Sequence, residues 1–368
     1  MVDLHSLVSI FDFEKEATKI LPRPALGYYQ SGATTEHTLK ENNDAIQRWK
    51  IRPRILVDVS KIDCSTRILG YPIRVPFGVA PTAMQRMAHP DGECANARAA
   101  ARMGTVFTLS TIATSSIEQI SSIEGLHFFQ LYIYKDRAIT KQLVKRAEKA
   151  GFKALVLTVD APNFGIRYAD VRNKFSLPPH LRLANFEGED EKSSGANTSR
   201  GGSGINEYVK SLFDPALTWK DVAWLQSITQ LPIVLKGVLT PEAAIKGVNS
   251  GAAAIWVSNH GARQIDTVSS TIDVLPEIVA AVGNKCEVYI DGGFRTGTDV
   301  YKALALGAKM VFLGRPLIWG LACGGEEGAY QVLNIMKTEL ESTMINSGYS
   351  AVTDIPRTSV SYGHSSKL

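Results

Sequence analysis

Short apolar runs, rich in β-branched and aromatic residues, recur eight times along the chain from residue 77 onward. The runs are Phe77–Pro81, Thr105–Leu109, Phe128–Tyr132, Ala154–Thr158, Pro232–Lys236, Ala253–Val257, Glu287–Asp291 and Met310–Gly314. Their apolar residues are continuous rather than alternating, which is typical of parallel strands buried on both faces. The pattern therefore predicts eight such strands.

Segments with helical character separate these runs, at residues 91–102, 138–150, 218–228, 240–248 and 298–306. Thr240 and Pro241 stand where a helix takes its N-cap and its first residue. Six of the seven intervals between successive strand starts are 21–34 residues, the length of one strand–helix unit. Two open sheets are an alternative, but nothing resembling a linker separates two sets of four strands. We expect an α/β fold, a (β/α)8 TIM barrel at about residues 77–320.

Three further parts of the chain complete this expectation. An N-terminal helical segment precedes the barrel, and residues 347–368 form a C-terminal tail, all within one domain over residues 1–368. The interval after the fourth strand is 78 residues long and contains a polar, Gly/Ser-rich stretch. This stretch, residues 184–206, is either a flexible linker or a lid. We prefer a lid, since loops that follow barrel strands lie on the catalytic face.

Charge and composition exclude several classes of function. The chain has 40 Lys+Arg against 36 Asp+Glu, a net charge of +4 without a basic run, so nucleic acid is not an expected partner. The longest stretch without a charged residue is 16 residues, shorter than a membrane span requires. The four cysteines show no C-x-x-C spacing, and we expect neither a metal site nor a disulfide framework. A soluble protein of a reducing compartment is the expectation.

The chain ends in Ser366-Lys367-Leu368, which matches the address read by the peroxisomal import receptor. A frayed terminus without meaning is the alternative. The match stands at the very end of the chain and follows polar residues, and we therefore favour import into the peroxisome.

Polar and charged residues stand at nearly every predicted strand end, where a barrel carries its functional groups. His260 with Arg263 three residues later offers a base beside a group that binds carboxylates. Asp160 could stabilise the imidazolium that forms when His260 takes a proton. Lys236 is a fixed cation at another strand end. The glycine-rich segments Asp291–Arg295 and Gly314–Arg315 indicate a phosphate site, which barrels often build after their last two strands.

Seven motifs in this order resemble the FMN-dependent 2-hydroxy-acid oxidase family, which includes glycolate oxidase and long-chain hydroxy-acid oxidase. They are Gly27–Ala33, Ala80–Met84, Phe129–Tyr132, Leu157–Asp160, Leu235–Gly237, Ser258–Gln264 and Asp291–Gly293. The most specific is Ser258–Gln264, and the resemblance runs from Leu21 to the C-terminal tail. It implies FMN as cofactor.

The resemblance also implies a role for individual residues. His260 would be the base, with Asp160 stabilising its protonated form. The substrate carboxylate would be held by Arg167, Arg263 and Tyr28. Tyr132 would hydrogen-bond the substrate hydroxyl or the developing keto oxygen. FMN would contact Pro81, Thr82, Ala83, Ser110, Gln130, Thr158 and Ser258. Lys236 would stabilise the reduced flavin ring. Asp291, Gly292, Gly293, Arg295, Gly314 and Arg315 would hold the ribityl chain and phosphate.

The implied reaction oxidises a (S)-2-hydroxy acid to the 2-oxo acid, and O2 then reoxidises the flavin to give hydrogen peroxide. The residues leave open whether the first half runs through a carbanion or a hydride. Alternatives are a dehydrogenase of the same fold with another acceptor, a flavin-binding protein without turnover and an FMN-dependent isomerase. The family resemblance further implies a homotetramer or homo-octamer.

Two departures from the family pattern concern substrate choice. Ile112 stands where plant-type glycolate oxidase carries a Trp, which would enlarge the pocket and weaken a strict preference for glycolate. Ile166 replaces one basic residue of a pair, although Arg167 remains.

Overall fold

The computed structural model describes residues 2–186 and 212–363. Its centre is a closed barrel of eight parallel strands in the order β10-β11-β4-β5-β6-β7-β8-β9. These strands are β4 (Phe77–Val79), β5 (Val106–Leu109), β6 (Leu126–Leu131), β7 (Leu155–Thr158), β8 (Ile233–Val238), β9 (Ala254–Val257), β10 (Glu287–Asp291) and β11 (Met310–Leu313). The eight predicted strands and the predicted (β/α)8 fold are confirmed.

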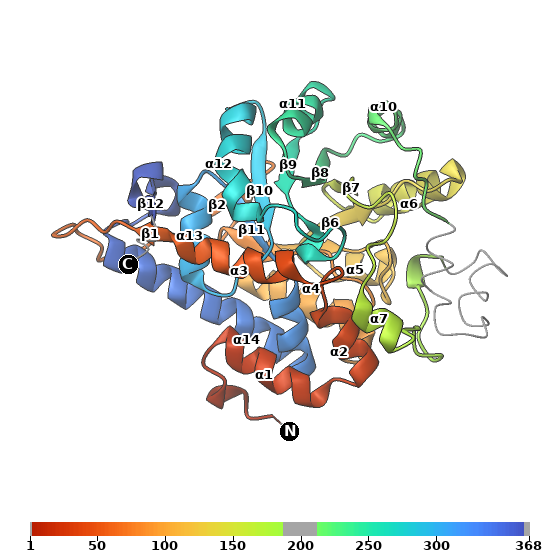
Figure 1. Cartoon of the computed structure of the whole chain (residues 1–368), viewed down its shortest axis with the longest axis horizontal. Coiled ribbons are helices and arrows are strands. Elements are labelled where there is room, and N and C mark those ends of the chain that lie inside the picture. The colour runs from red at the N-terminus through yellow and green to blue at the C-terminus, as the bar shows by residue number, and fades with distance from the viewer. Residues whose placement is uncertain (1, 187–211, 364–368) are drawn as a thin grey trace.

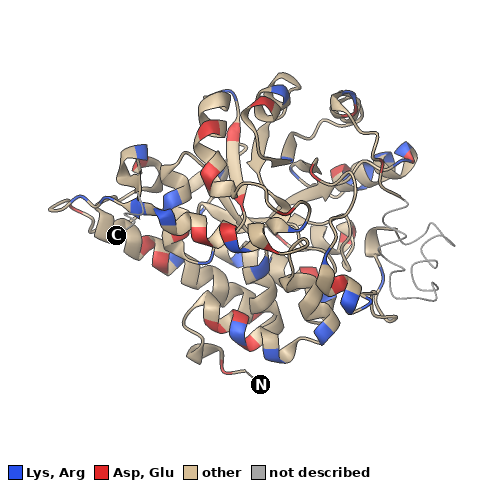
Figure 2. Cartoon of the chain, viewed as in Figure 1, with Lys and Arg blue, Asp and Glu red and all other residues tan. Residues whose placement is uncertain are grey.

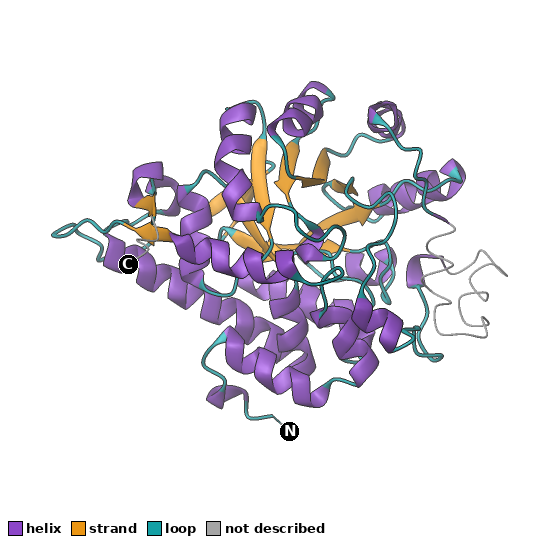
Figure 3. Cartoon of the chain, in the orientation of Figure 1, coloured by secondary structure: helices purple, strands orange, loops and turns teal. Residues whose placement is uncertain are grey.

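Helices surround the barrel (Figure 3). Those between or after the strands are α4 (Gly92–Met103), α5 (Ile117–Ser121), α6 (Arg137–Lys149), α7 (Tyr168–Arg172), α10 (Trp219–Ile228), α11 (Pro241–Asn249), α12 (Thr271–Val282), α13 (Gly297–Ala305) and α14 (Arg315–Ser347). The five predicted helices correspond to α4, α6, α10, α11 and α13. Thr240 caps α11 by accepting the Ala243 N–H, as its sequence indicated.

The predicted N-terminal helical segment consists of α1 (Ile10–Ile20), α2 (Arg23–Gln30) and α3 (His37–Arg48). Helix α1 packs along the long helix α14, so these two helices from distant parts of the sequence lie side by side (Figure 1). Helix α3 contacts α12 and the segment that follows β9. The N-terminal segment therefore reaches the face of the barrel at which the strands end.

Four short strands lie outside the barrel and were not predicted: β1 (Trp49–Ile51), β2 (Thr66–Ile68), β3 (Tyr71–Ile73) and β12 (Val360–Tyr362). Ile68 and Ile73 of the β2–β3 hairpin join the apolar cluster inside the barrel, where Phe128, Trp256 and Phe312 are buried. The hairpin therefore closes the end of the barrel opposite to the strand C-termini.

Most of the expected C-terminal tail, residues 347–368, is folded against the rest of the protein. Strand β12 pairs with β1, and Ser359 and Val360 are buried. Of the expected lid, residues 184–186 form a 3-10 turn, and residues 187–206 lie outside the described residues, as do Ser366, Lys367 and Leu368.

Charges are distributed without a dominant sign: Figure 2 shows Lys and Arg mixed with Asp and Glu along the outer helices. In residues 2–186 and 212–363, no helix is long and apolar enough to cross a membrane. The same residues contain no cluster of His, Cys, Asp and Glu able to hold a metal ion. All four cysteines are free thiols.

Candidate active site

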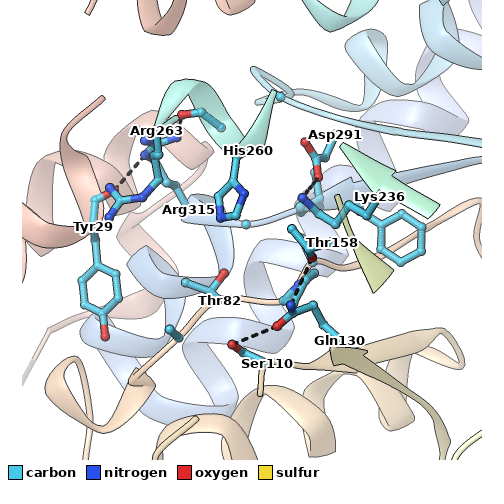
Figure 4. Close-up of a pocket in the computed structure, with 18 of the residues that line it drawn as sticks. Tyr29, Thr82, Ser110, Gln130, Thr158, Lys236, His260, Arg263, Asp291 and Arg315 are labelled. Carbon is cyan, nitrogen blue, oxygen red and sulfur yellow. Dashed lines mark hydrogen bonds and ion pairs between the residues drawn. The ribbon is translucent and has the colours of Figure 1, made fainter. Parts of the chain in front are cut away.

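A cavity opens at the C-terminal ends of the barrel strands (Figure 4). Together with its open mouth it contains about 1210 Å³ of space that no atom fills. The predicted site residues that line it are Tyr28, Pro81, Thr82, Ala83, Ser110, Ile112, Gln130, Tyr132, Thr158, Arg167, Lys236, His260, Arg263, Asp291, Gly292, Gly293, Arg295, Gly314 and Arg315. Asp160 and Ser258 lie behind this lining, in contact with His260 and Lys236. The structure therefore brings every predicted site residue to one place.

His260 is held in a fixed orientation. Its Nδ1 lies 2.9 Å from Asp160 Oδ1, and its backbone N–H donates to Ser258 Oγ (3.0 Å). A neutral imidazole that donates its Nδ1 proton to Asp160 presents an unprotonated Nε2 as acceptor. Burial lowers the pKa of His260, and the charge of Asp160 opposes this effect. The ring is therefore neutral at physiological pH and able to take a proton.

The turn that carries His260 has an unusual backbone. His260, Gly261 and Ala262 have φ values of 59°, 62° and 63°, so two non-glycine residues adopt the left-handed conformation. Such strain persists only where surrounding contacts hold it. Asn259 supplies them: it exchanges two amide hydrogen bonds with Asn42 of α3 (2.9 and 2.8 Å), and its Oδ1 accepts the Ala262 N–H.

Gly237 makes room for the carboxylate of Asp160. Its φ is +107°, and a Cβ there would come within 2.5 Å of Asp160 Cγ. Any other residue after Lys236 would displace the partner of His260.

Lys236 forms a buried polar group with Ser258 and Asp291. Its Nζ donates to Ser258 Oγ (2.9 Å) and lies 3.2 Å from Asp291 Oδ2, while Ser258 Oγ donates to Asp291 Oδ1 (2.7 Å). Figure 4 shows Lys236 and Asp291 on one side of the cavity. The ion pair keeps a cation stable in a buried place, where an unpaired charge would be costly.

Three polar side chains form a row at the ends of neighbouring strands. Gln130 Nε2 donates to Thr158 Oγ1 (3.0 Å), and Ser110 Oγ donates to Gln130 Oε1 (3.4 Å). These two hydrogen bonds fix the orientation of the Gln130 amide, because one uses its nitrogen as donor and the other its oxygen as acceptor. The row presents a polar wall of defined geometry to a ligand in the cavity (Figure 4).

Arginines gather at the opposite side of the cavity. Burial, together with the nearby charge of Arg263, lowers the pKa of Arg167 to about 10. Burial, together with the charges of Arg263 and Arg295, lowers the pKa of Arg315 to about 9. Arg263 Nη2 is buried without a hydrogen-bond partner in the described chain. Buried cations that repel one another are stabilised by an anion. The chemistry of this donor set therefore fits anionic ligands such as a carboxylate and a phosphate.

Glu93 is a site component that sequence reasoning missed. This fully buried carboxylate accepts the N–H groups of Gln85 and Thr114 (2.9 Å each) and the hydroxyls of Thr114 and Ser115 (both 2.8 Å). It thereby fastens the loop after β4 to the loop after β5, which carry Thr82 and Ile112. The only sequence signal was an acidic residue in the first turn of an Ala-rich helix.

The profile of a family described as FMN-dependent dehydrogenase matches residues 17–362. The chain belongs to this family. The predicted resemblance is thereby confirmed, and with it FMN as the cofactor.

Relatives and solved structures of this FMN-dependent family extend the comparison. The chain is 53% identical to glycolate oxidase 1 of Oryza sativa subsp. indica over 95% of both chains. It is 52% identical to glycolate oxidase of Spinacia oleracea, covering 96% of this chain and 95% of that relative. A crystal structure of mandelate oxidase with (S)-4-hydroxymandelic acid matches with a TM-score of 0.91 at 40% identity, covering 96% and 98% of the two chains.

Proposed function

We propose that this chain is an FMN-dependent oxidase of (S)-2-hydroxy acids that releases the 2-oxo acid and hydrogen peroxide. The observation that carries the proposal is that His260, which pairs with Asp160 (2.9 Å), lines one cavity with Arg167 and Arg263. A 2-hydroxy acid requires a base at its hydroxyl-bearing end and a carboxylate-binding group at its other end. The relatives named glycolate oxidase and mandelate oxidase act on acids of this class.

The substrate carboxylate binds to Arg167, Arg263 and Tyr28. The free Nη2 of Arg263 supplies one donor, and the Arg263 guanidinium lies 4.7 Å from the centre of the Tyr28 ring. Tyr132 binds the substrate hydroxyl. Burial raises the pKa of Tyr132, so its hydroxyl keeps its proton and can donate it in a hydrogen bond. His260 takes a proton from the substrate, and Asp160 stabilises the resulting imidazolium.

The remaining lining residues would hold the cofactor, and FMN would supply the two-electron acceptor of the reaction. Lys236 would provide a buried positive charge that stabilises the reduced flavin. Asp291, Gly292, Gly293, Arg295, Gly314 and Arg315 hold the ribityl chain and phosphate, while Pro81, Thr82, Ala83, Ser110, Gln130, Thr158 and Ser258 contact the rest. The whole chain, residues 1–368, acts as one FMN-binding domain.

The second candidate is a 2-hydroxy-acid dehydrogenase that passes electrons to an acceptor other than O2. An oxygen electrode separates the two with glycolate, lactate and a longer 2-hydroxy acid as substrates. Oxygen consumption with one peroxide per 2-oxo acid supports the oxidase. Turnover that requires an added quinone or dye supports the dehydrogenase.

Ile112 is a wall of the substrate cavity. Ile112→Trp is expected to shift the ranking of kcat/KM toward the smallest acids, because the indole fills space that an aliphatic tail would occupy. A single methylene in an apolar pocket changes selectivity by roughly 10–200-fold. A panel of acids of increasing length measures the shift, and an unaltered ranking in the variant would show that Ile112 does not set the substrate size.

We further propose that the enzyme works in the peroxisome as a homotetramer or homo-octamer. Deleting Leu368 is expected to leave a fluorescent fusion in the cytosol, because the import receptor reads the terminal tripeptide. The intact chain serves as the control. Continued import of the truncated chain contradicts the peroxisomal address.

The oligomeric state is tested separately, by light scattering of the purified protein.

A further inference from the structure

Two arginines of the site bind the C-terminal end of helix α2. Arg263 Nη1 donates to the carbonyls of Tyr28 (2.5 Å) and Ser31 (2.7 Å). Arg315 donates from Nε to the Tyr29 carbonyl (2.8 Å) and from Nη2 to that of Ser31 (3.0 Å). Figure 4 shows both guanidinium groups beside Tyr29. The last carbonyls of a helix have no partner within it and carry the negative end of its dipole. Arg315 also donates to the Gly261 carbonyl (3.0 Å). The orientation of Arg263, and in part that of Arg315, therefore depends on where residues 28–31 lie.

The chain that follows residues 28–31 is fastened to the segment after β9. The Ala33 N–H donates to the Ala262 carbonyl (2.7 Å). One residue, Asp266, holds the next turn: its Oδ2 accepts the Thr34 hydroxyl (3.0 Å) and both the N–H (3.1 Å) and the hydroxyl (2.6 Å) of Thr35. Its Oδ1 accepts the Thr38 N–H (2.8 Å).

Asp266 also caps helix α3 from outside the helix. The N-cap residue of α3, Glu36, has a φ of +64° and makes no side-chain cap. Its carboxylate instead accepts the Gly32 N–H (2.9 Å). The Thr38 N–H would lack a side-chain partner without Asp266. Burial raises the pKa of Asp266, but these hydrogen bonds outweigh it and hold the pKa well below its ordinary value. The lowered pKa favours the ionised carboxylate, which accepts four donors from one turn.

We propose that Asp266 is a positioning residue that sets the orientation of Arg263 and Arg315 through the turn Thr34–Thr38. Asp266 stands three residues after Arg263 in the chain. The same segment therefore carries Arg263 and binds the turn Thr34–Thr38. The carbonyls that orient Arg263 come directly before this turn. This proposal rests on the assignment of Arg263 to the substrate carboxylate and of Arg315 to the phosphate. It adds a residue that touches neither ligand.

The test variant is Asp266→Asn, which keeps the size of the side chain but removes the charge and one of the two acceptor oxygens. The KM for the 2-hydroxy acid and the Kd of oxalate, measured by perturbation of the flavin spectrum, are expected to rise about tenfold, the effect of losing hydrogen bonds to a charged group. The Kd of FMN for the apoprotein is expected to rise as well. Because the lost contacts affect ground state and transition state alike, kcat should change little.

Asp273→Asn is the matched control. Asp273 also lies after β9. Its carboxylate accepts the hydroxyl of Ser270, the N-cap residue of α12 (2.8 Å), and pairs with Arg48 at the far end of α3 (2.5 Å). Both Asp273→Asn and Asp266→Asn are expected to lower the melting temperature. Asp273→Asn should do so without changing the KM, the Kd of oxalate or the Kd of FMN. If both variants lose stability equally and both retain the wild-type constants, Asp266 is structural and the proposal is wrong.

Thr35→Val covers the case in which Asp266→Asn does not fold. Thr35 is exposed, and the change removes one hydroxyl from Asp266. A smaller rise in the same constants supports the proposal, and unchanged constants overturn it. Failure of the proposed function is a separate result: the wild-type protein would then oxidise no 2-hydroxy acid.

Discussion

Replacing His260 by alanine is expected to lower the rate of flavin reduction by about 10²–10⁴-fold, the usual contribution of a general base, while FMN stays bound. The imidazole is the group that can take a proton at neutral pH, because burial keeps it uncharged and Asp160 fixes its Nδ1. Alanine leaves the buried contacts of Lys236, Ser258 and Asp291 in place. Anaerobic stopped-flow mixing with substrate measures the reduction rate, and the flavin absorbance measures the bound cofactor.

His89→Ala provides the control for that experiment. His89 is also near a carboxylate, with its Nδ1 4.0 Å from Asp91 Oδ2, but it does not line the cavity. Its loss should leave flavin reduction unchanged. In the wild-type enzyme, the acid limb of the kcat/KM profile should lie below pH 6.5, because the neutral form of His260 is the active one and its pKa is lowered. Reduction at the wild-type rate in His260→Ala would remove His260 as the base.

The barrel could be predicted because its strands are buried on both faces and so leave continuous apolar runs. The strand ends could be predicted for a related reason: Lys236, Asp291 and His260 interrupt those runs with groups that a core would exclude. The short strands β1 and β12 left no such signal. They are three residues long and partly exposed, so their pairing depends on the packing around them.

The residues that support the site could not be predicted by pattern. Asp266, for example, binds residues 228–232 positions away in the chain. Asp and Glu at a helix start or in a loop are common and are in most cases exposed caps. The hydrogen-bond partners of such residues come close only when the barrel has closed and the N-terminal segment has packed against it. Only the folded chain shows that Glu93 and Asp266 connect loops that carry site residues.

Removing either carboxylate-binding arginine is expected to weaken substrate binding by about 3–5 kcal/mol, the cost of breaking a buried charge pair. This corresponds to a rise in Kd of roughly a hundredfold to several thousandfold. Arg167→Ala removes a buried guanidinium whose Nε donates to the Arg263 carbonyl (3.3 Å). Arg263→Ala removes the unpartnered Nη2. It also leaves the Tyr28 carbonyl without its donor and the Ser31 carbonyl with Arg315 alone, so it should lower the melting temperature more.

Arg263→Lys separates charge from geometry. The ammonium keeps the positive charge but not the planar pair of donors, of which Nη1 binds the backbone and Nη2 is free for the ligand. Its substrate affinity should therefore fall between those of the wild-type enzyme and Arg263→Ala. Arg172→Ala is the matched control, since this exposed arginine of α7 lies near the Tyr168 ring and outside the cavity lining. Titration of the oxidised flavin with oxalate gives the affinities without turnover. Unchanged affinity in both alanine variants would show that the substrate carboxylate binds at a place other than Arg167 and Arg263.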